Sequence, residues 1–115
     1  MDAARALADL VEISPQVEAA AVLAGDGGTV GCVGVPAARA GVLARAARDL
    51  LDRAAEFRHD DGRVTQLHAE LGDGAVFAVA GADDRTIVAV LSGRPAPGLV
   101  FYDLKTCLGR LADEA

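Results

Sequence analysis

Apolar residues recur along the chain with two different periods. Over residues 2–12 they return every three or four positions opposite charged residues, which predicts an amphipathic helix. Ser14-Pro15 ends that helix, because a residue before proline avoids the α-helical region. Two short apolar runs follow, at 17–23 and 29–35, and GDGG separates them. They predict a β-hairpin whose strands are both buried on two faces.

The stretch AGDGGTVG, residues 24–31, poses a choice between a phosphate-binding loop and a hairpin turn. Gly25 and Gly27 fit the dinucleotide fingerprint G-x-G-x-x-G, but Val30 stands where the third glycine is needed and strand formers follow instead of a helix. Asp26-Gly27 predicts a hairpin turn of the primed type, which requires positive φ. A P-loop is excluded at Lys105, since leucine precedes it where glycine is required. We therefore expect no bound cofactor and no intrinsic nucleotide hydrolysis.

A long helix is expected from Pro36, at its first position, to about Arg58. At 100° per residue one apolar face is predicted to pack on the sheet: Leu43, Ala46, Ala47, Leu50, Ala54 and Phe57. The opposite face is charged: Arg45, Arg48, Asp49, Asp52 and Glu56. Between them lies a small-residue flank: Ala44, Leu51 and Ala55. This flank either admits a partner helix at close range or is an alanine stripe in solvent.

After a polar turn, HDDG at 59–62, three strands are expected at 63–71, 75–81 and 85–92. Their short links, GDG and ADD, make the connections hairpins and the strands antiparallel. The first of the three is much more polar than the others, so it is predicted to lie at a sheet edge with its backbone free to pair. A last helix is predicted beyond GRPAPG, with an apolar stripe from Val100 to Leu111. The chain is thus predicted to be α+β, with a sheet covered by helices on both faces.

Length and charge limit the possible functions. The 115 residues predict a single domain spanning 1–115. A net charge of -6, without a basic cluster, argues against nucleic acid as a partner. No apolar run is long enough for membrane insertion, and the N-terminus lacks the apolar core of a secretory peptide. We therefore expect a cytoplasmic protein whose Cys32 and Cys107, far apart in sequence, are reduced.

Candidate catalytic and metal-binding residues are few. His59 with Asp60 and Asp61 suggests a metal or acid–base site, but adjacent side chains point in different directions and a polar turn explains them better. His68 alternates with Gln66 and Glu70 on one face of the expected edge strand, as a partly exposed polar residue. Neither serine, Ser14 nor Ser92, lies in a nucleophile elbow. We expect no catalytic residue and no metal site.

These elements together resemble the Roadblock/LC7 family. The matching segments are, in order, LADLVEISPQVEAAAVLAGDGG, the long alanine-rich helix, VTQLHAELGDGAVFAVAGADDRTIVAVLSG and GLVFYDLKTCLGRL. They cover nearly the whole chain as patterns of apolar positions and turns. The resemblance implies a helix–strand–strand–helix–strand–strand–strand–helix order around a five-stranded antiparallel sheet, with strand order 2-1-5-4-3, a profilin-like architecture.

The resemblance also implies a function. Family members form homodimers by pairing their third strands and long second helices, and bacterial ones resemble partners or regulators of small Ras-like GTPases. The expected dimer interface comprises Ala44, Leu51, Ala55, Val64, Leu67 and Ala69. The expected GTPase-facing residues are Arg45, Arg48, Asp49, Asp52 and Glu56. The sequence begins almost at its first helix, so a direct GTPase-activating role is not expected.

A non-enzymatic dimeric adaptor or regulator that binds a small Ras-like GTPase or a signalling or motility complex is therefore the first functional hypothesis. The alternative is a small-ligand sensor of the PAS, GAF or profilin-like kind, which needs a cavity with convergent polar groups. The interiors of the expected strands consist of Ala, Val, Leu and Phe and supply no such groups. The adaptor is preferred on that ground.

Overall fold

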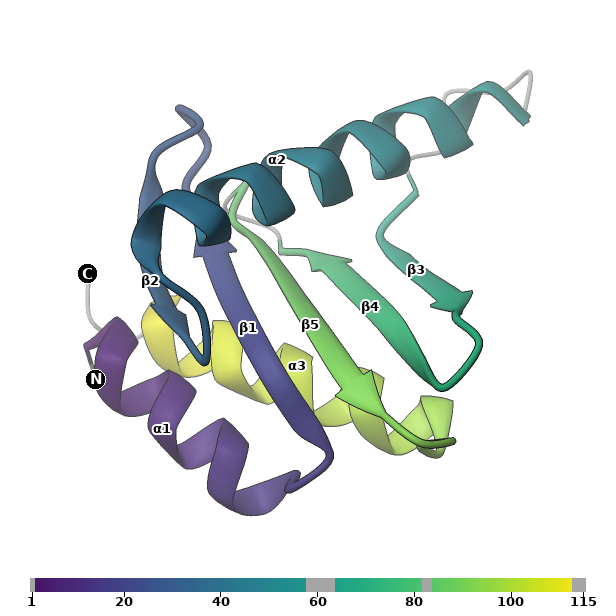
Figure 1. Cartoon of the computed structure of the whole chain (residues 1–115). Coiled ribbons are helices and arrows are strands. Elements are labelled where there is room, and N and C mark those ends of the chain that lie inside the picture. Colours follow the sequence, from purple (N-terminus) through teal and green to yellow (C-terminus); the bar gives the residue numbers. More distant parts are fainter. Residues whose placement is uncertain (1, 58–63, 82–83, 113–115) are drawn as a thin grey trace.

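The computed structural model describes residues 2–57, 64–81 and 84–112. Within them the chain forms three α-helices, five strands and one short 3₁₀ turn (Figure 1). Their bounds, in chain order, are α1 (Ala3–Ile13), β1 (Val17–Leu23), β2 (Thr29–Val33), α2 (Ala37–Ala54), η1 (Ala55–Phe57), β3 (Gln66–Glu70), β4 (Gly74–Ala80), β5 (Thr86–Ser92) and α3 (Pro97–Ala112). The order of helices and strands is the predicted one.

The strands form one sheet in the order β2-β1-β5-β4-β3, and every neighbouring pair is antiparallel. This confirms the predicted topology and places β3 at one edge of the sheet and β2 at the other. Helices α1 and α3 lie on one face, and α2 crosses the opposite face (Figure 1). The two faces therefore have separate hydrophobic cores.

The larger core lies between the sheet and the pair α1 and α3. Phe77 is its largest fully buried side chain, and it meets the ring of Phe101 edge-on at 5.2 Å between centroids. The core under α2 is built mainly from alanines of the helix and the sheet, among them Ala40, Ala44 and Ala78. Because alanine projects only one carbon beyond the backbone, α2 packs closely on the sheet.

The predicted core face of α2 is right in part: Ala47 is buried and Leu43 packs against the core, but Leu50 and Phe57 are exposed. Ala44 and Leu51, which the sequence assigned to the flank for a partner, are 0% and 4% exposed against the chain's own sheet. Leu50 and Phe57, predicted to be core, are 49% and 90% exposed. Sequence periodicity favoured the face with larger side chains, but the close packing of α2 admits the smaller ones.

The bounds of α2 also differ slightly from the expected ones. Pro36 is the N-cap and not the first helical residue, and the α-helix ends at Ala54 before the η1 turn. The expected end at Arg58 lies outside the described residues, as do the HDDG turn and residues 82–83 of the ADD link. None of the described helices combines the length and hydropathy needed to cross a lipid bilayer.

The stretch at 24–28 is a hairpin turn, as predicted, but its type is different. Gly27 N–H donates to Ala24 O at 3.0 Å, so Gly25 and Asp26 are the central residues of the turn. Only Gly27 has positive φ, at 92°, whereas a primed turn needs it within the central pair. The Asp26 side chain accepts from Gly28 N at 2.8 Å and closes the loop. The expectation that both strands of this hairpin are buried on two faces holds for β1 apart from the exposed Glu18 and fails for β2, which is an edge strand.

Candidate functional site

The outer side of α2 and η1 carries an apolar strip in solvent. Val42, Leu50 and Phe57 are 52%, 49% and 90% exposed, and Ala46 lies between them. Residues spaced in this way fall on one side of a helix. Contiguous exposed apolar patches are common where a protein contacts another protein. We call these four residues the α2 strip.

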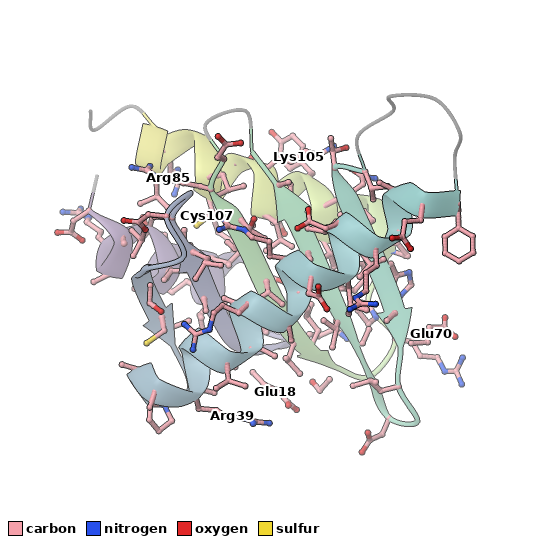
Figure 2. All side chains as sticks on the ribbon, turned by 90° about the horizontal axis from the view of Figure 1, so that it is seen from above. Glu18, Arg39, Glu70, Arg85, Lys105 and Cys107 are labelled. Atoms are coloured by element: carbon pink, nitrogen blue, oxygen red, sulfur yellow. The ribbon has the colours of Figure 1, made fainter. Side chains whose placement is uncertain are left out.

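The edge strand β3 directs some of its side chains to the face of the sheet on which α2 packs. Its apolar residues Leu67 and Ala69 are half-buried on the α2 side, and Val76 of β4 beside them is half-buried too. Thus α2 leaves the sheet partly uncovered next to β3, as the view from above shows (Figure 2). The predicted position of β3 at a sheet edge is confirmed.

The hydrogen bonds of β3 show which of its backbone groups face outward. Ala80 N–H donates to Thr65 O and Leu71 N–H donates to Gly74 O, both at 2.8 Å, in pairs that share one register with Leu67↔Ala78. Hydrogen-bonded and non-hydrogen-bonded pairs alternate in an antiparallel ladder. Residues 65, 67, 69 and 71 therefore bond to β4, and Gln66, His68 and Glu70 direct their backbone groups to the open edge.

The residues predicted for a dimer interface fall into two groups in the structure. Ala44 and Leu51 are core residues under α2, so their assignment to a surface for a partner is wrong. Ala55 is half-buried and lines a groove together with Val64. Leu67 and Ala69 remain at the edge strand. The exposed apolar residues of α2 are therefore those of the α2 strip and not those of the small-residue flank.

Arg48 is not part of a solvent-facing charged surface, contrary to expectation. Its guanidinium turns to the end of the sheet and donates to the carbonyls of Ala24 and Asp84, both at 2.8 Å. It also donates to Leu23 O at 3.3 Å and to the buried Thr86 hydroxyl at 3.2 Å. Arg48 thus joins the β1–β2 turn to the start of β5, which is a structural role.

The other charged residues of α2 and η1 are exposed, as expected: Arg45, Asp49, Asp52 and Glu56. Asp49 forms a salt bridge with Arg53 one helical turn away, with Nε to Oδ2 at 3.0 Å. The two side chains are 63% and 71% exposed, so water screens the pair and it contributes little to stability. These residues lie on the flank of α2 away from Leu50, whereas the side with the α2 strip also carries the exposed Arg39 and Arg53.

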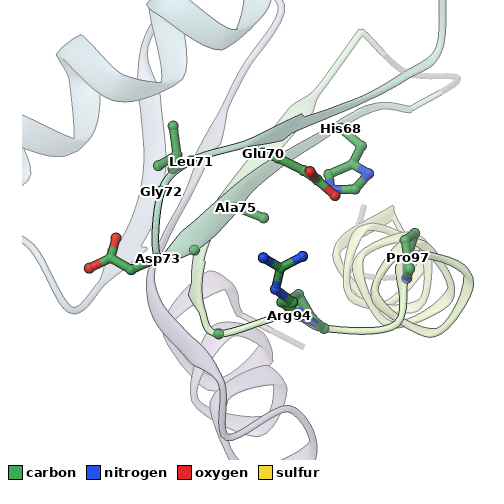
Figure 3. Close-up of a pocket in the computed structure, with 11 residues that line it drawn as sticks. His68, Glu70, Leu71, Gly72, Asp73, Ala75, Arg94 and Pro97 are labelled. Carbon is green, nitrogen blue, oxygen red and sulfur yellow. The ribbon is translucent and has the colours of Figure 1, made fainter.

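A pocket of about 450 Å³ lies where the β3–β4 hairpin and the β5–α3 loop diverge (Figure 3). His68 and Glu70 of β3 form part of one wall, and Arg94 and Pro97 stand across from them. The sequence did not reveal this pocket, because Arg94 is 24 positions from Glu70 and 26 from His68, and none of these residues belongs to a motif. In the sequence, the alternation of Gln66, His68 and Glu70 along one face of the strand was the one feature that pointed to this wall of the pocket.

Metal-binding and nucleophilic groups are sparse. Among the described residues no three His, Cys, Asp or Glu side chains are arranged to hold a metal ion. The predicted turn with His59, Asp60 and Asp61 lies outside the described residues. Both cysteines are free thiols, and burial raises the pKa of Cys107 to about 11 while nearby Arg110 partly opposes that increase.

Solved structures with this architecture include Roadblock/LC7 domains. A Roadblock/LC7 domain from Streptomyces avermitilis superposes with a TM-score of 0.84 at 22% identity, covering 99% of this chain and 98% of that one. MglB from Myxococcus xanthus gives a TM-score of 0.71 at 12% identity, covering 91% and 80%. LokiProfilin1, solved in complex with rabbit actin, gives 0.64 at 12% identity, covering 98% and 96%.

No protein-family model matches the sequence, and no curated protein is similar to it. The structural similarity nevertheless shows that the chain has the Roadblock/LC7 fold, which is also profilin-like. The resemblance inferred from apolar positions and turns is confirmed at the level of the fold.

Proposed function

We propose that this protein is a non-enzymatic homodimeric adaptor that binds a small Ras-like GTPase in the cytoplasm. One observation carries the proposal: the open sheet edge at β3 adjoins the face on which α2 packs, and α2 carries exposed apolar residues. The fold supports it, because the sequence resemblance links Roadblock/LC7 domains to such dimers and GTPases. Among the structures with this fold, MglB of Thermus thermophilus is a gliding protein, and one MglB structure has a tetrameric arrangement.

The dimer is formed by two-fold pairing of β3 with β3 of a second copy. A two-fold axis brings the same patch of each chain together, so the outward backbone groups of Gln66, His68 and Glu70 meet their counterparts. The sheet then continues across the axis. The two α2 strips meet above it and bury Leu50 and Phe57, which would otherwise expose their side chains to water.

The GTPase contacts the charged flank of α2, which the dimer leaves free. Arg45, Asp49, Asp52 and Glu56 carry both signs of charge and are doubled by the axis. Charge of both signs at an interface favours correct orientation and fast association more than affinity. Arg48 is not included, because its side chain bonds within the chain.

The first test is the mass of the protein in solution by light scattering at micromolar concentration. The wild type should have twice the 11.7 kDa chain mass. Leu50→Asp should shift it to the monomer mass because it places charge in the apolar contact. Lys105→Glu changes the charge of an exposed residue on α3, on the opposite face, and should remain dimeric (Figure 2). A wild-type monomer, or a dimer that Leu50→Asp leaves unchanged, would contradict the proposed interface.

Proline substitutions at adjacent positions of β3 test the strand pairing separately. Gln66→Pro removes an outward N–H and should lower the dimer fraction while the fold persists, since an edge strand tolerates proline on its open side. Leu67→Pro removes an N–H that bonds to β4 and should lower the free energy of unfolding. Equal effects of the two substitutions on dimer mass and on stability would show that β3 is not paired at this edge.

The GTPase contact is tested by titrating the dimer with Ras-like GTPases from the native cell, loaded with GDP or a GTP analogue. Arg45→Glu should weaken binding and leave the dimer intact, because Arg45 is exposed and outside the core. Lys105→Glu is the charge-matched control and should bind as the wild type does. Wild-type affinity of Arg45→Glu would place the contact elsewhere, and GTP hydrolysis by the adaptor alone would refute its non-enzymatic role.

A further inference from the structure

His68 lies in the middle of the open edge of β3 and leaves one face of its ring free. The imidazole is stacked on Phe77 of β4 with 4.3 Å between centroids and 7° between planes, and Phe77 in turn meets Phe101 of α3. Because Phe77 covers the inner face, the outer face of the imidazole points away from β4 and off the edge of the sheet. The free face therefore lies where a second copy pairs in the proposed dimer.

The backbone bonds of β3 favour one register for that pairing. The bonds to β4 run from Thr65 O to Leu71 N–H, a stretch centred on residue 68, and the outward groups belong to residues 66, 68 and 70. With the two-fold axis at residue 68, Gln66 of each copy faces Glu70 of the other, so all these outward groups are bonded. An axis at residue 67 or 69 places one of them opposite a residue outside β3.

This register also matches the side chains on both faces of the sheet. On the α2 side, Leu67 faces Ala69 of the second copy, and both are half-buried and apolar. On the α3 side, the Gln66 amide faces the Glu70 carboxylate, to which it can donate. Each His68 faces His68 of the second copy, with Cα atoms about 5.5 Å apart in such a pair. Since each ring is parallel to Phe77 behind it, the two imidazoles meet face to face.

We propose that His68 lies on the two-fold axis, stacked on His68 of the second copy, and that protonation of the two rings opens the dimer. The inference rests on the homodimer proposed above. The neutral rings continue the stack on Phe77 across the interface, and stacked aromatic rings attract one another beyond the area that they bury. Histidine changes its charge between about pH 5 and 8. Two imidazolium rings in contact repel each other, because they leave no water between them to screen the charges.

Charged groups near each ring come from several elements. Glu70 follows two residues later on the same face of β3, and the residues of β4 that flank Phe77 carry no charge. Figure 3 shows the Arg94 guanidinium directed toward the side where His68 and Glu70 lie, whereas Asp73 points away. On α3 the nearest charged residue along the helix is Lys105, one turn after Phe101 and exposed.

These groups do not cancel the repulsion between the two rings. Glu70 attracts an imidazolium on its own strand in the monomer and in the dimer alike, so this attraction does not change the affinity between copies. Glu70 of the second copy lies diagonally across the axis, about 7–8 Å away, and is exposed to water that screens it. The rings touch, so their repulsion is the larger change on dimerisation. Protonation is therefore more favourable in the monomer, and the dimer weakens as the pH falls.

Single-cysteine variants test the register in a Cys32→Ser background, which leaves the buried Cys107. With oxidised glutathione, His68→Cys should form a covalent dimer, because opposite Cα atoms about 5.5 Å apart are within reach of a disulfide. Gln66→Cys is the matched control and should not cross-link to itself, since the two copies of residue 66 are then about 14 Å apart. Dimer mass without a cross-link at His68→Cys, or with one at Gln66→Cys alone, would refute the register and leave the homodimer standing.

Light scattering over a range of protein concentrations, at about pH 8 and about pH 5.5, tests the switch. The Kd of the wild-type dimer should rise at least about tenfold at the lower pH. His68→Phe keeps the stack without a titrating ring, so its Kd should change less than about twofold. His59→Gln removes the chain's other histidine and should keep the wild-type response. Acidification reduces the net charge of -6 and with it the general repulsion between copies, so the expected loss of dimer has the opposite sign to that general effect.

The switch is wrong if the wild-type dimer is equally tight or tighter at the lower pH, or if His68→Phe keeps the full pH response. A monomer at both pH values contradicts the homodimer itself and the inference with it. A dimer at both pH values contradicts the switch alone.

Discussion

Arg48 allows a quantitative test of how the sheet end is held together. Its guanidinium makes two short bonds of 2.8 Å, to Ala24 O and Asp84 O, and longer bonds to Leu23 O and Thr86 Oγ1. Leu23 is 0% and Thr86 3% exposed, so water cannot easily replace the arginine at these two acceptors. Truncation at Arg48 therefore leaves buried groups without a donor.

The magnitude follows from these contacts. A hydrogen bond to a charged group contributes about 1.5–3 kcal/mol, and the carbonyls in the turns regain water when the arginine is removed. We therefore expect Arg48→Ala to lower the free energy of unfolding by about 2–4 kcal/mol, a shift in Tm of about 8–15 °C for a domain of this size. Arg48→Lys keeps the charge but lacks the planar fork, so it should recover less than half of the loss.

Urea unfolding of wild type, Arg48→Ala, Arg48→Lys and Arg45→Ala at one protein concentration measures these differences. The fixed concentration matters because dimerisation adds to apparent stability. Arg45 is exposed, and Arg45→Ala should stay within about 0.5 kcal/mol of the wild type. A similarly small loss in Arg48→Ala would refute the structural role of this residue.

Three further predictions follow from burial and backbone geometry. Gly34→Ala should lower the free energy of unfolding in urea by about 2–4 kcal/mol, because the φ of Gly34 is 78° and an added Cβ would meet Glu18 O. An added Cβ at Gly72 has nothing within 4 Å, so Gly72→Ala should lower the free energy of unfolding by less than about 0.5 kcal/mol. Equal losses in the two variants would contradict this. Phe77→Ala should lower the free energy of unfolding by about 3–5 kcal/mol, because Phe77 is fully buried. Phe57→Ala should change the dimer fraction, measured by light scattering, more than the free energy of unfolding, measured with urea, because Phe57 is exposed. Cys107 should resist alkylation by iodoacetamide at pH 8.5, because the Cys107 pKa of about 11 keeps its thiol protonated until the pH approaches that value. The half-buried Cys32 should react under the same conditions. Mass spectrometry of the labelled peptides measures both, and faster labelling of Cys107 would contradict the prediction.

The fold was predictable because most of its elements have a clear local signal. Val17–Leu23 was predicted to the residue, and the edge position of β3 followed from its polarity beside the apolar runs of β4 and β5. Asp26-Gly27 marked the hairpin, although the primed turn type predicted from it was wrong.

The site was less predictable, because it depends on which side of α2 packs inward. Periodicity shows that a helix has apolar sides but not which one meets the sheet, and the large residues Leu50 and Phe57 favoured the wrong choice. Arg48 shows the same limit, since its bonding partners lie 24 and 36 positions away. The pocket with Glu70 and Arg94 also depends on tertiary structure, because α3 begins beside the hairpin only in the folded chain.

The central claim is that two copies of this chain pair through β3. It is tested most directly by NOE measurements filtered for contacts between chains, in a sample that mixes labelled and unlabelled protomers. The account predicts contacts between chains that connect the backbone protons of Gln66, His68 and Glu70 with the same strand of the second copy, in antiparallel register. Absence of such contacts in a sample with dimer mass, or contacts at β2 instead, would contradict it.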